Sequence, residues 1–126
     1  MRVIVCGGRD YTDREAITET LRKAFEGRGT FGTLVHGTCR GADLTAAEVA
    51  AGHGLAVEPF PPPLAVHGSP RAFHIRNQAM ADAGADLCLA FPGGAGTADC
   101  VRRCERAGIP VRRLPDRGRC AHGAAI

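Results

Sequence analysis

The chain has 126 residues, of which 44% are hydrophobic and 23% charged, and its formal net charge is +3. This length and composition are typical of one globular domain with a buried core. No apolar run approaches the ~18 residues of a membrane span, and the N-terminal residues lack the apolar region of a signal peptide, so we expect a cytoplasmic protein. The charge is too small to indicate nucleic-acid binding, and we interpret the arginines of the last quarter as a solvated surface.

Strands alternate with helices along the chain. Short apolar runs predict strands at 2–6, 33–36, 55–60, 87–91 and 110–114. Amphipathic stretches predict helices between them: one that begins after an Asp13 N-cap and ends near residue 26, and others at 42–53, 71–83 and, after a Thr97 N-cap, 98–107. This alternation is typical of an α/β fold, and we predict a single Rossmann-like open parallel sheet of about five strands, in the order 3-2-1-4-5, with helices on both faces.

Two segments fall outside this alternation. Residues 61–70 begin with three prolines and form the one long irregular segment, which is either a lid over a site or a rigid connector. Residues 115–126 are rich in Arg, Gly and Ala and are expected to be a flexible tail. The predicted domain therefore covers residues 1–114.

Glycine-rich loops follow the first, second and fourth predicted strands. In the order 3-2-1-4-5 the strand order reverses between the first and fourth strands, and ligands bind such a fold at that reversal. A strand, a glycine turn and a helix N-terminus in sequence direct free N–H groups and the positive end of a helix dipole at one point, which favours phosphate. The loops lack the G-x-G-x-x-G pattern, and no acidic residue ends the second strand, so an ordinary NAD dehydrogenase is disfavoured.

Four ordered motifs resemble the SLOG superfamily, and within it the small YspA-related proteins. The motifs are Val-Cys-Gly-Gly-Arg-Asp-Tyr (5–11), His-Gly-Thr-Cys-Arg-Gly-Ala-Asp (36–43), Ile-Arg-Asn-Gln-Ala-Met (75–80) and Pro-Gly-Gly-Ala-Gly-Thr-Ala-Asp (92–99). The superfamily also holds the LONELY GUY phosphoribohydrolases and the DNA-processing protein DprA. The resemblance implies a nucleotide-type ligand and a possible homodimer.

The LONELY GUY signature is Pro-Gly-Gly-x-Gly-Thr-x-x-Glu, and an upstream Arg acts with its Glu. The Arg position falls at Arg76, whereas the Glu position falls at Cys100. A thiol does not readily replace a carboxylate that stabilises an oxocarbenium-like transition state. The candidate catalytic residues are therefore Arg76, with Asp99 or Asp43 as the carboxylate. Both aspartates have an alternative role as negative charges at helix N-termini.

The remaining candidate site residues are expected to bind the ligand. Main-chain N–H groups of the glycine loops are expected to hold phosphate, and the nearby polar side chains to contact phosphate or ribose. These residues are Gly7, Gly8, Arg9, Gly37, Arg40, Gly41, Asn77, Gly93, Gly94, Gly96 and Thr97.

The six cysteines do not predict a metal site. Cys6 and Cys88 lie within predicted strands, where free cysteine behaves as a small buried hydrophobe. Cys100 and Cys104 share one helix face and Cys120 and His122 follow, but this spacing matches no standard zinc pattern. We predict neither a metal nor a cofactor.

Three functions stay open on the sequence. The first is a sensor or processing domain that binds a nucleotide or nucleotide-derived ligand. The second is an N-glycosidase that releases the base from a nucleoside 5′-monophosphate. The third, single-stranded DNA binding, is disfavoured because few aromatic residues are available to stack on bases.

Overall fold

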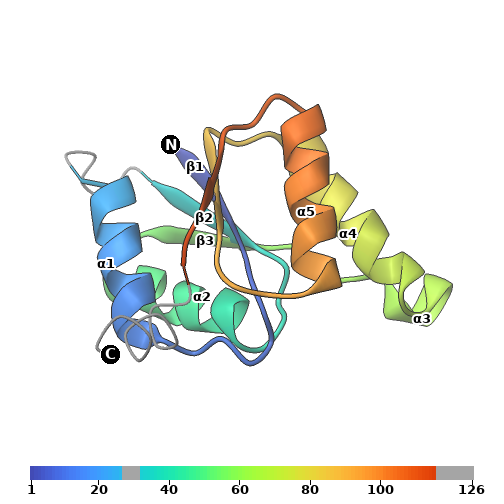
Figure 1. Ribbon diagram of the computed structural model, residues 1–126, viewed down its shortest axis with the longest axis horizontal. Helices are drawn as coiled ribbons and strands as arrows, with labels where there is room; N and C mark the ends of the chain where they lie inside the picture. Colours follow the sequence, from blue (N-terminus) through green and yellow to red (C-terminus); the bar gives the residue numbers. More distant parts are fainter. Residues whose placement is uncertain (27–31, 116–126) are drawn as a thin grey trace, which may run out of the picture.

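One parallel sheet forms the centre of the computed structural model, which describes residues 1–26 and 32–115. Its strand order is β3-β2-β1-β4-β5, as predicted (Figure 1). The strands are β1 (Arg2–Cys6), β2 (Thr33–His36), β3 (Ala56–Pro59), β4 (Leu87–Ala90) and β5 (Val111–Arg113).

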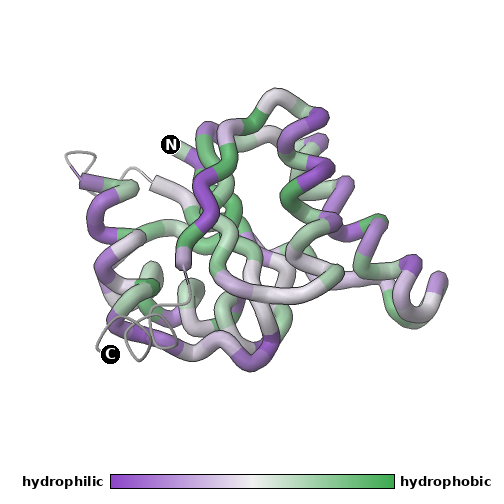
Figure 2. The backbone as a smooth tube through the Cα atoms, in the orientation of Figure 1, coloured by the Kyte–Doolittle hydropathy of each residue, from purple (hydrophilic) through white to green (hydrophobic). Residues whose placement is uncertain are grey.

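Helices cover both faces of the sheet, which confirms the predicted layers (Figure 1). They are α1 (Arg14–Ala24), α2 (Ala42–Gly52), α3 (Leu64–His67), α4 (Arg71–Ala83) and α5 (Ala95–Arg106). The helices α1 and α2 pack on one face, and α4 and α5 on the other. Figure 2 shows hydrophilic and hydrophobic residues alternating along α1 and α5, as expected of helices with one buried face.

The central strand β1 separates two hydrophobic clusters. Successive side chains of a strand point to opposite faces of the sheet. Val3 and Val5 accordingly belong to the cluster beneath α1 and α2, whereas Ile4 and Cys6 belong to the cluster beneath α4 and α5. The near-continuous apolar sequence of β1 follows from burial on both faces.

The start of α5 corrects one prediction. The N-cap is Gly94, whose carbonyl oxygen accepts the Ala98 N–H at 3.1 Å, so the helix begins three residues earlier than the predicted residue 98. Thr97 therefore lies in the first turn and is not the cap. The prediction relied on Thr as a favoured N-cap and on glycine as a poor helix former, but each preference is worth only about 1 kcal/mol and does not by itself fix where a helix begins. At α1 the predicted cap is confirmed, since the Asp13 side chain accepts the Ala16 N–H at 3.0 Å.

The proline-rich segment is also more regular than expected. Residues 64–67 form the short helix α3, so 61–70 is not irregular throughout. The C-cap residue Gly68 has a φ of 68°, a conformation that glycine adopts without strain. The predicted flexible tail lies outside the described residues, apart from Pro115.

Candidate functional site

A cavity of about 430 Å³ lies at the carboxyl ends of β1 and β4, where the strand order reverses. Its walls are the β1–α1 loop, the start of α2, the inner face of α4 and the first turn of α5. Crevices at such a reversal are the usual ligand sites of open parallel sheets. The structure therefore places a cavity where the sequence predicted one.

Glycine allows the loops after β1 and β4 to touch. The Gly8 N–H donates to the Pro92 carbonyl oxygen at 2.8 Å. A Cβ at Gly7 would lie 2.6 Å from Cβ of Ala42 and 2.9 Å from Cβ of Phe91, closer than side chains approach. Gly7 is thus required for packing, whatever the cavity binds.

The glycines at the start of α5 meet no such constraint. Apart from the adjoining residues and the backbone of α5 itself, no described atom lies within 4 Å of the position that a Cβ would take at Gly94 or Gly96, and both residues line the cavity. The first N–H groups of an α-helix have no partner within the helix, and Gly94 provides no side-chain cap. The open space and the free donors fit an anion that approaches the backbone closely.

Arg76 brings a buried positive charge to the cavity wall. Its side chain is 7% exposed, its Nη1 donates to the Gly37 carbonyl oxygen, and its Nε donates to Oδ1 of Asn77 at 2.8 Å. Within residues 1–26 and 32–115, no carboxylate lies within ion-pair distance of this guanidinium. A buried charge is costly unless it is paired, so the cavity is suited to an anion that would pair with Arg76.

Asp43 is the carboxylate that lines the same cavity. It is 5% exposed, and its Oδ2 accepts the Gly37 N–H at 2.9 Å. Burial raises the pKa of Asp43 to about 6, although the Gly37 hydrogen bond and the positive charge of Arg76 act in the opposite direction. The carboxyl group therefore changes protonation close to neutral pH, as a general acid or base must.

Asp99 lies behind the wall rather than on it. Its Oδ2 accepts from Nδ2 of Asn77 at 3.0 Å and from Nε of Arg103 at 2.9 Å. Burial acts to raise its pKa, but the hydrogen bonds from Arg103 and Asn77 outweigh that effect and lower the pKa below its usual value. Because Asn77 in turn accepts from Arg76, Asp99 orients the guanidinium through one intermediate side chain.

Two arginines lie near one aromatic ring of the cavity wall. The guanidinium groups of Arg9 and Arg76 lie 5.2 and 5.5 Å from the centre of the Phe73 ring, within the range of cation–π contacts. Arg40, by contrast, is solvent-exposed, pairs with Asp10 at 3.4 Å and does not line the cavity.

The structure brings most, but not all, of the predicted site residues to the cavity wall. Those on the wall are Gly7, Gly8, Arg9, Asp43, Arg76, Asn77, Gly94, Gly96 and Thr97. Those away from it are Gly37, Arg40, Gly41, Gly93 and Asp99. Their roles in binding or catalysis stay predictions.

Sequence reasoning missed several wall residues. They are Cys6, Cys39, Ser69, Pro70, Phe73, His74, Met80 and Ala95. Helical spacing could have indicated Phe73 and Met80, because residues 73, 76, 77 and 80 lie on one face of α4. No local pattern marks Ser69 or Pro70, which the chain brings to the site by tertiary folding.

The fold and the crevice together define a Rossmann-like α/β protein with a glycine-loop site. Residues 1–67 match the YspA, cpYpsA-related SLOG family. The Gene 61 protein of Mycobacterium phage D29 is 37% identical over 125 residues, which cover 92% of this chain and 98% of the phage protein. The chain belongs to this SLOG family, which confirms the resemblance seen in its motifs.

Two solved structures share the fold. The X-ray structure of TM1055 has a TM-score of 0.68 at 20% identity and covers 87% of this chain and 71% of its own. That of DNA processing protein A (DprA) from Streptococcus pneumoniae has a TM-score of 0.66 at 18% identity, and this chain spans half of its length. In the part of the chain that the structure describes, no helix is long and apolar enough to cross a bilayer.

Proposed function

We propose that the crevice binds a nucleotide or nucleotide-derived ligand through its phosphate and ribose. The observation that carries this proposal is the buried guanidinium of Arg76, which has no carboxylate within ion-pair distance among the described residues and lies on the wall of the cavity. The free N–H groups at the start of α5 line the same cavity. Phosphate satisfies both features, because it pairs with Arg and accepts from helix N-termini.

Membership of the SLOG family supports a nucleotide-related role in general. The ligand is expected to place its phosphate between Arg76 and the first turn of α5. The carboxylate of Asp43 then lies on the wall as an acceptor for ribose hydroxyl groups. Arg9 and Phe73 at the cavity mouth provide flat surfaces on which a base could stack.

Asp43 favours one alternative, an N-glycosidase that acts on a nucleoside 5′-monophosphate. Its carboxyl group has a pKa of about 6 and lines the same cavity as Arg76. A carboxyl group that titrates near neutral pH, beside an arginine, is suited to acid–base cleavage of an N-glycosidic bond. Asp99 is less suited, because its carboxylate is bound to Asn77 and Arg103. Cys100 is fully buried away from the cavity wall and does not replace the missing Glu.

Thermal unfolding in the presence of ligands tests binding. The protein is heated with inorganic phosphate, with nucleoside 5′-monophosphates, with ADP-ribose and with a single-stranded oligonucleotide. We expect the Tm to rise with a mononucleotide or ADP-ribose, and the rise to be lost in Arg76→Met but retained in Arg40→Met, whose arginine lies outside the cavity. Equal loss in both variants, or a response to the oligonucleotide alone, would contradict the proposal.

Chromatography of the same mixtures separates binding from hydrolysis. Free base that wild-type protein releases, and that Asp43→Asn does not, would establish the N-glycosidase. If the protein binds a nucleotide but releases no base, the result supports a binding module that acts as a sensor or processing domain. The homodimer and the cytoplasmic location stay predictions.

A further inference from the structure

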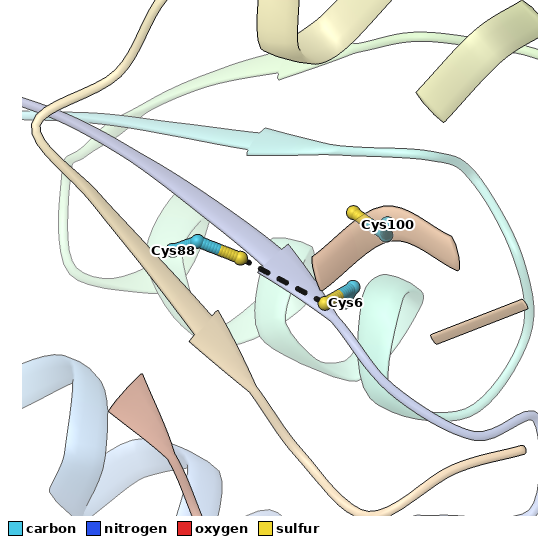
Figure 3. A group of neighbouring side chains, drawn as sticks. All are labelled: Cys6, Cys88 and Cys100. Atoms are coloured by element: carbon cyan, nitrogen blue, oxygen red, sulfur yellow. Dashed lines mark hydrogen bonds between the residues drawn. The ribbon is translucent and has the colours of Figure 1, made fainter. Parts of the chain in front are cut away.

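Three cysteine thiols meet at one buried point beneath the cavity. The Sγ atoms of Cys6, Cys88 and Cys100 all lie within 4.8 Å of one another, and those of Cys6 and Cys88 are 3.8 Å apart (Figure 3). The exposed fractions of these residues are 6%, 0% and 1%. All three are free thiols.

The grouping follows from three secondary-structure elements. In the parallel register Ile4 of β1 pairs with Cys88 of β4, so Cys6 and Cys88 are diagonal neighbours on the same face of the sheet. Cys100 lies on the buried face of α5, and Cys104, one turn later, lies beside the thiols of Cys88 and Cys100. Three thiols thus meet between the sheet and α5, and a fourth lies next to two of them.

This arrangement fits the requirements of a thiophilic metal ion. Zn²⁺ binds thiolates tetrahedrally with Zn–S distances of about 2.3 Å, which places the sulfur atoms about 3.8 Å apart. The distance between Cys6 and Cys88 already has this value, and the other pairs within the trio need to close by 1 Å at most. Burial of cysteine as a small hydrophobe explains why each thiol is inside, but it does not explain why three of them meet at one point with a fourth beside two of them.

We propose that Cys6, Cys88, Cys100 and Cys104 form a buried tetrahedral thiolate site for Zn²⁺. Each thiol loses its proton and donates a sulfur lone pair to the ion, so binding one Zn²⁺ releases about four protons. The complex has two negative charges, one for each thiolate beyond the charge of the ion. The ion can enter from the cavity, because Cys6 lies on its wall.

The site would tie the sheet to α5. β1 and β4 precede the two glycine loops that touch, and α5 provides the free N–H groups at the cavity. A metal that joins these three elements would hold the loops in register and stabilise the folded protein by mass action. This inference does not rest on nucleotide binding.

Metal titration of the full chain tests the site. The protein is reduced, treated with a chelator and titrated first with Co²⁺ and then with Zn²⁺. We expect one ion per chain, thiolate-to-cobalt charge-transfer bands in the near ultraviolet, displacement of Co²⁺ by Zn²⁺ and release of about four protons. X-ray absorption of the zinc form should show sulfur neighbours at about 2.3 Å.

Matched variants locate the ion. Cys88→Ser and Cys100→Ser should each weaken Zn²⁺ binding by more than about 100-fold, because each removes a direct ligand. Loss of a residue that only hydrogen-bonds to a metal ligand already weakens binding by about 10- to 100-fold. The double variant Cys39→Ser/Cys120→Ser keeps all four proposed ligands and should bind as wild type does. If Cys88→Ser and Cys100→Ser still bind Zn²⁺ and the double variant does not, the ion binds elsewhere and the proposal is overturned.

Wild-type readouts decide the question even where a cysteine variant does not fold. Absence of charge-transfer bands, or a zinc shell made mainly of nitrogen and oxygen, would refute the thiolate site. Both measurements use the native chain and require no substitution.

Discussion

Replacing Asp43 by Asn should change the stability of the protein in a way that depends on pH. The pKa of Asp43 is raised from 3.8 to about 6, mainly because the side chain is buried. A carboxyl group with a higher pKa in the folded state binds its proton more tightly when folded. The free energy of unfolding therefore decreases as the pH rises from about 4 to about 6.

The size of this effect follows from the two pKa values. Each pH unit between them is worth about 1.36 kcal/mol, so ionisation of Asp43 costs the folded state about 3 kcal/mol above pH 6. Asp43→Asn removes the charge and keeps an oxygen that can accept the Gly37 N–H. Its new NH₂ group costs about 1 kcal/mol at every pH if it finds no partner. The difference between variant and wild type should thus shift by about 2.5 kcal/mol between pH 4 and pH 7.5, because at pH 4 the unfolded carboxyl group is already partly ionised.

Urea unfolding at about pH 4 and about pH 7.5 measures this shift. We expect Asp43→Asn to be no more stable than wild type at the lower pH, and more stable by about 2 kcal/mol at the higher pH. Asp10→Asn is the control, because that exposed carboxylate makes only a surface ion pair with Arg40. The same stability difference at both pH values would mean that Asp43 ionises as it does in water, and the proposed acid–base role would lose its basis.

Two glycine substitutions should separate binding from folding. Gly96→Ala adds a Cβ to open space within α5 and should raise the free energy of unfolding by about 0.5–1 kcal/mol, as measured by urea unfolding. The same Cβ should weaken nucleotide binding, as measured by ligand titration. Unchanged ligand affinity would show that no ligand approaches this part of the backbone. Gly7→Ala forces a Cβ against Ala42 and Phe91, so urea unfolding should show a loss of stability of about 1–3 kcal/mol. A variant as stable as wild type would contradict the tight packing around Gly7.

The periodicity of the sequence was sufficient to predict the fold. Residues 2–6 and 87–91 are short apolar runs, and each precedes a glycine turn and an amphipathic helix. Local rules of this kind depend on neighbours a few residues apart, and these neighbours are visible in the chain itself. They failed at Gly94 and Thr97, because cap and propensity preferences of about 1 kcal/mol favoured a start after Thr97, whereas α5 begins at Ala95.

The candidate site was predictable only in part. The motifs indicated Arg76, Asp43 and the loop glycines, and the structure places both side chains and the glycines at 7, 8, 94 and 96 on one cavity. The sequence could not show that Asp99 faces Arg103 and Asn77 instead of the cavity, because that depends on how α4 and α5 pack. It also gave no reason to connect Ser69 or Pro70 with the glycine loops.

The sequence by itself determined the strand and helix pattern, the position of the glycine-loop crevice and the family to which the chain belongs, since these depend on residue types at short spacings. Only the tertiary structure decided which charges are buried and which groups meet. Burial raises the pKa of Asp43 and encloses Arg76 with no carboxylate of the described residues within ion-pair distance. It also gathers Cys6, Cys88 and Cys100 from segments that are far apart in sequence. Such convergence depends on strand register and helix packing, which no local pattern encodes.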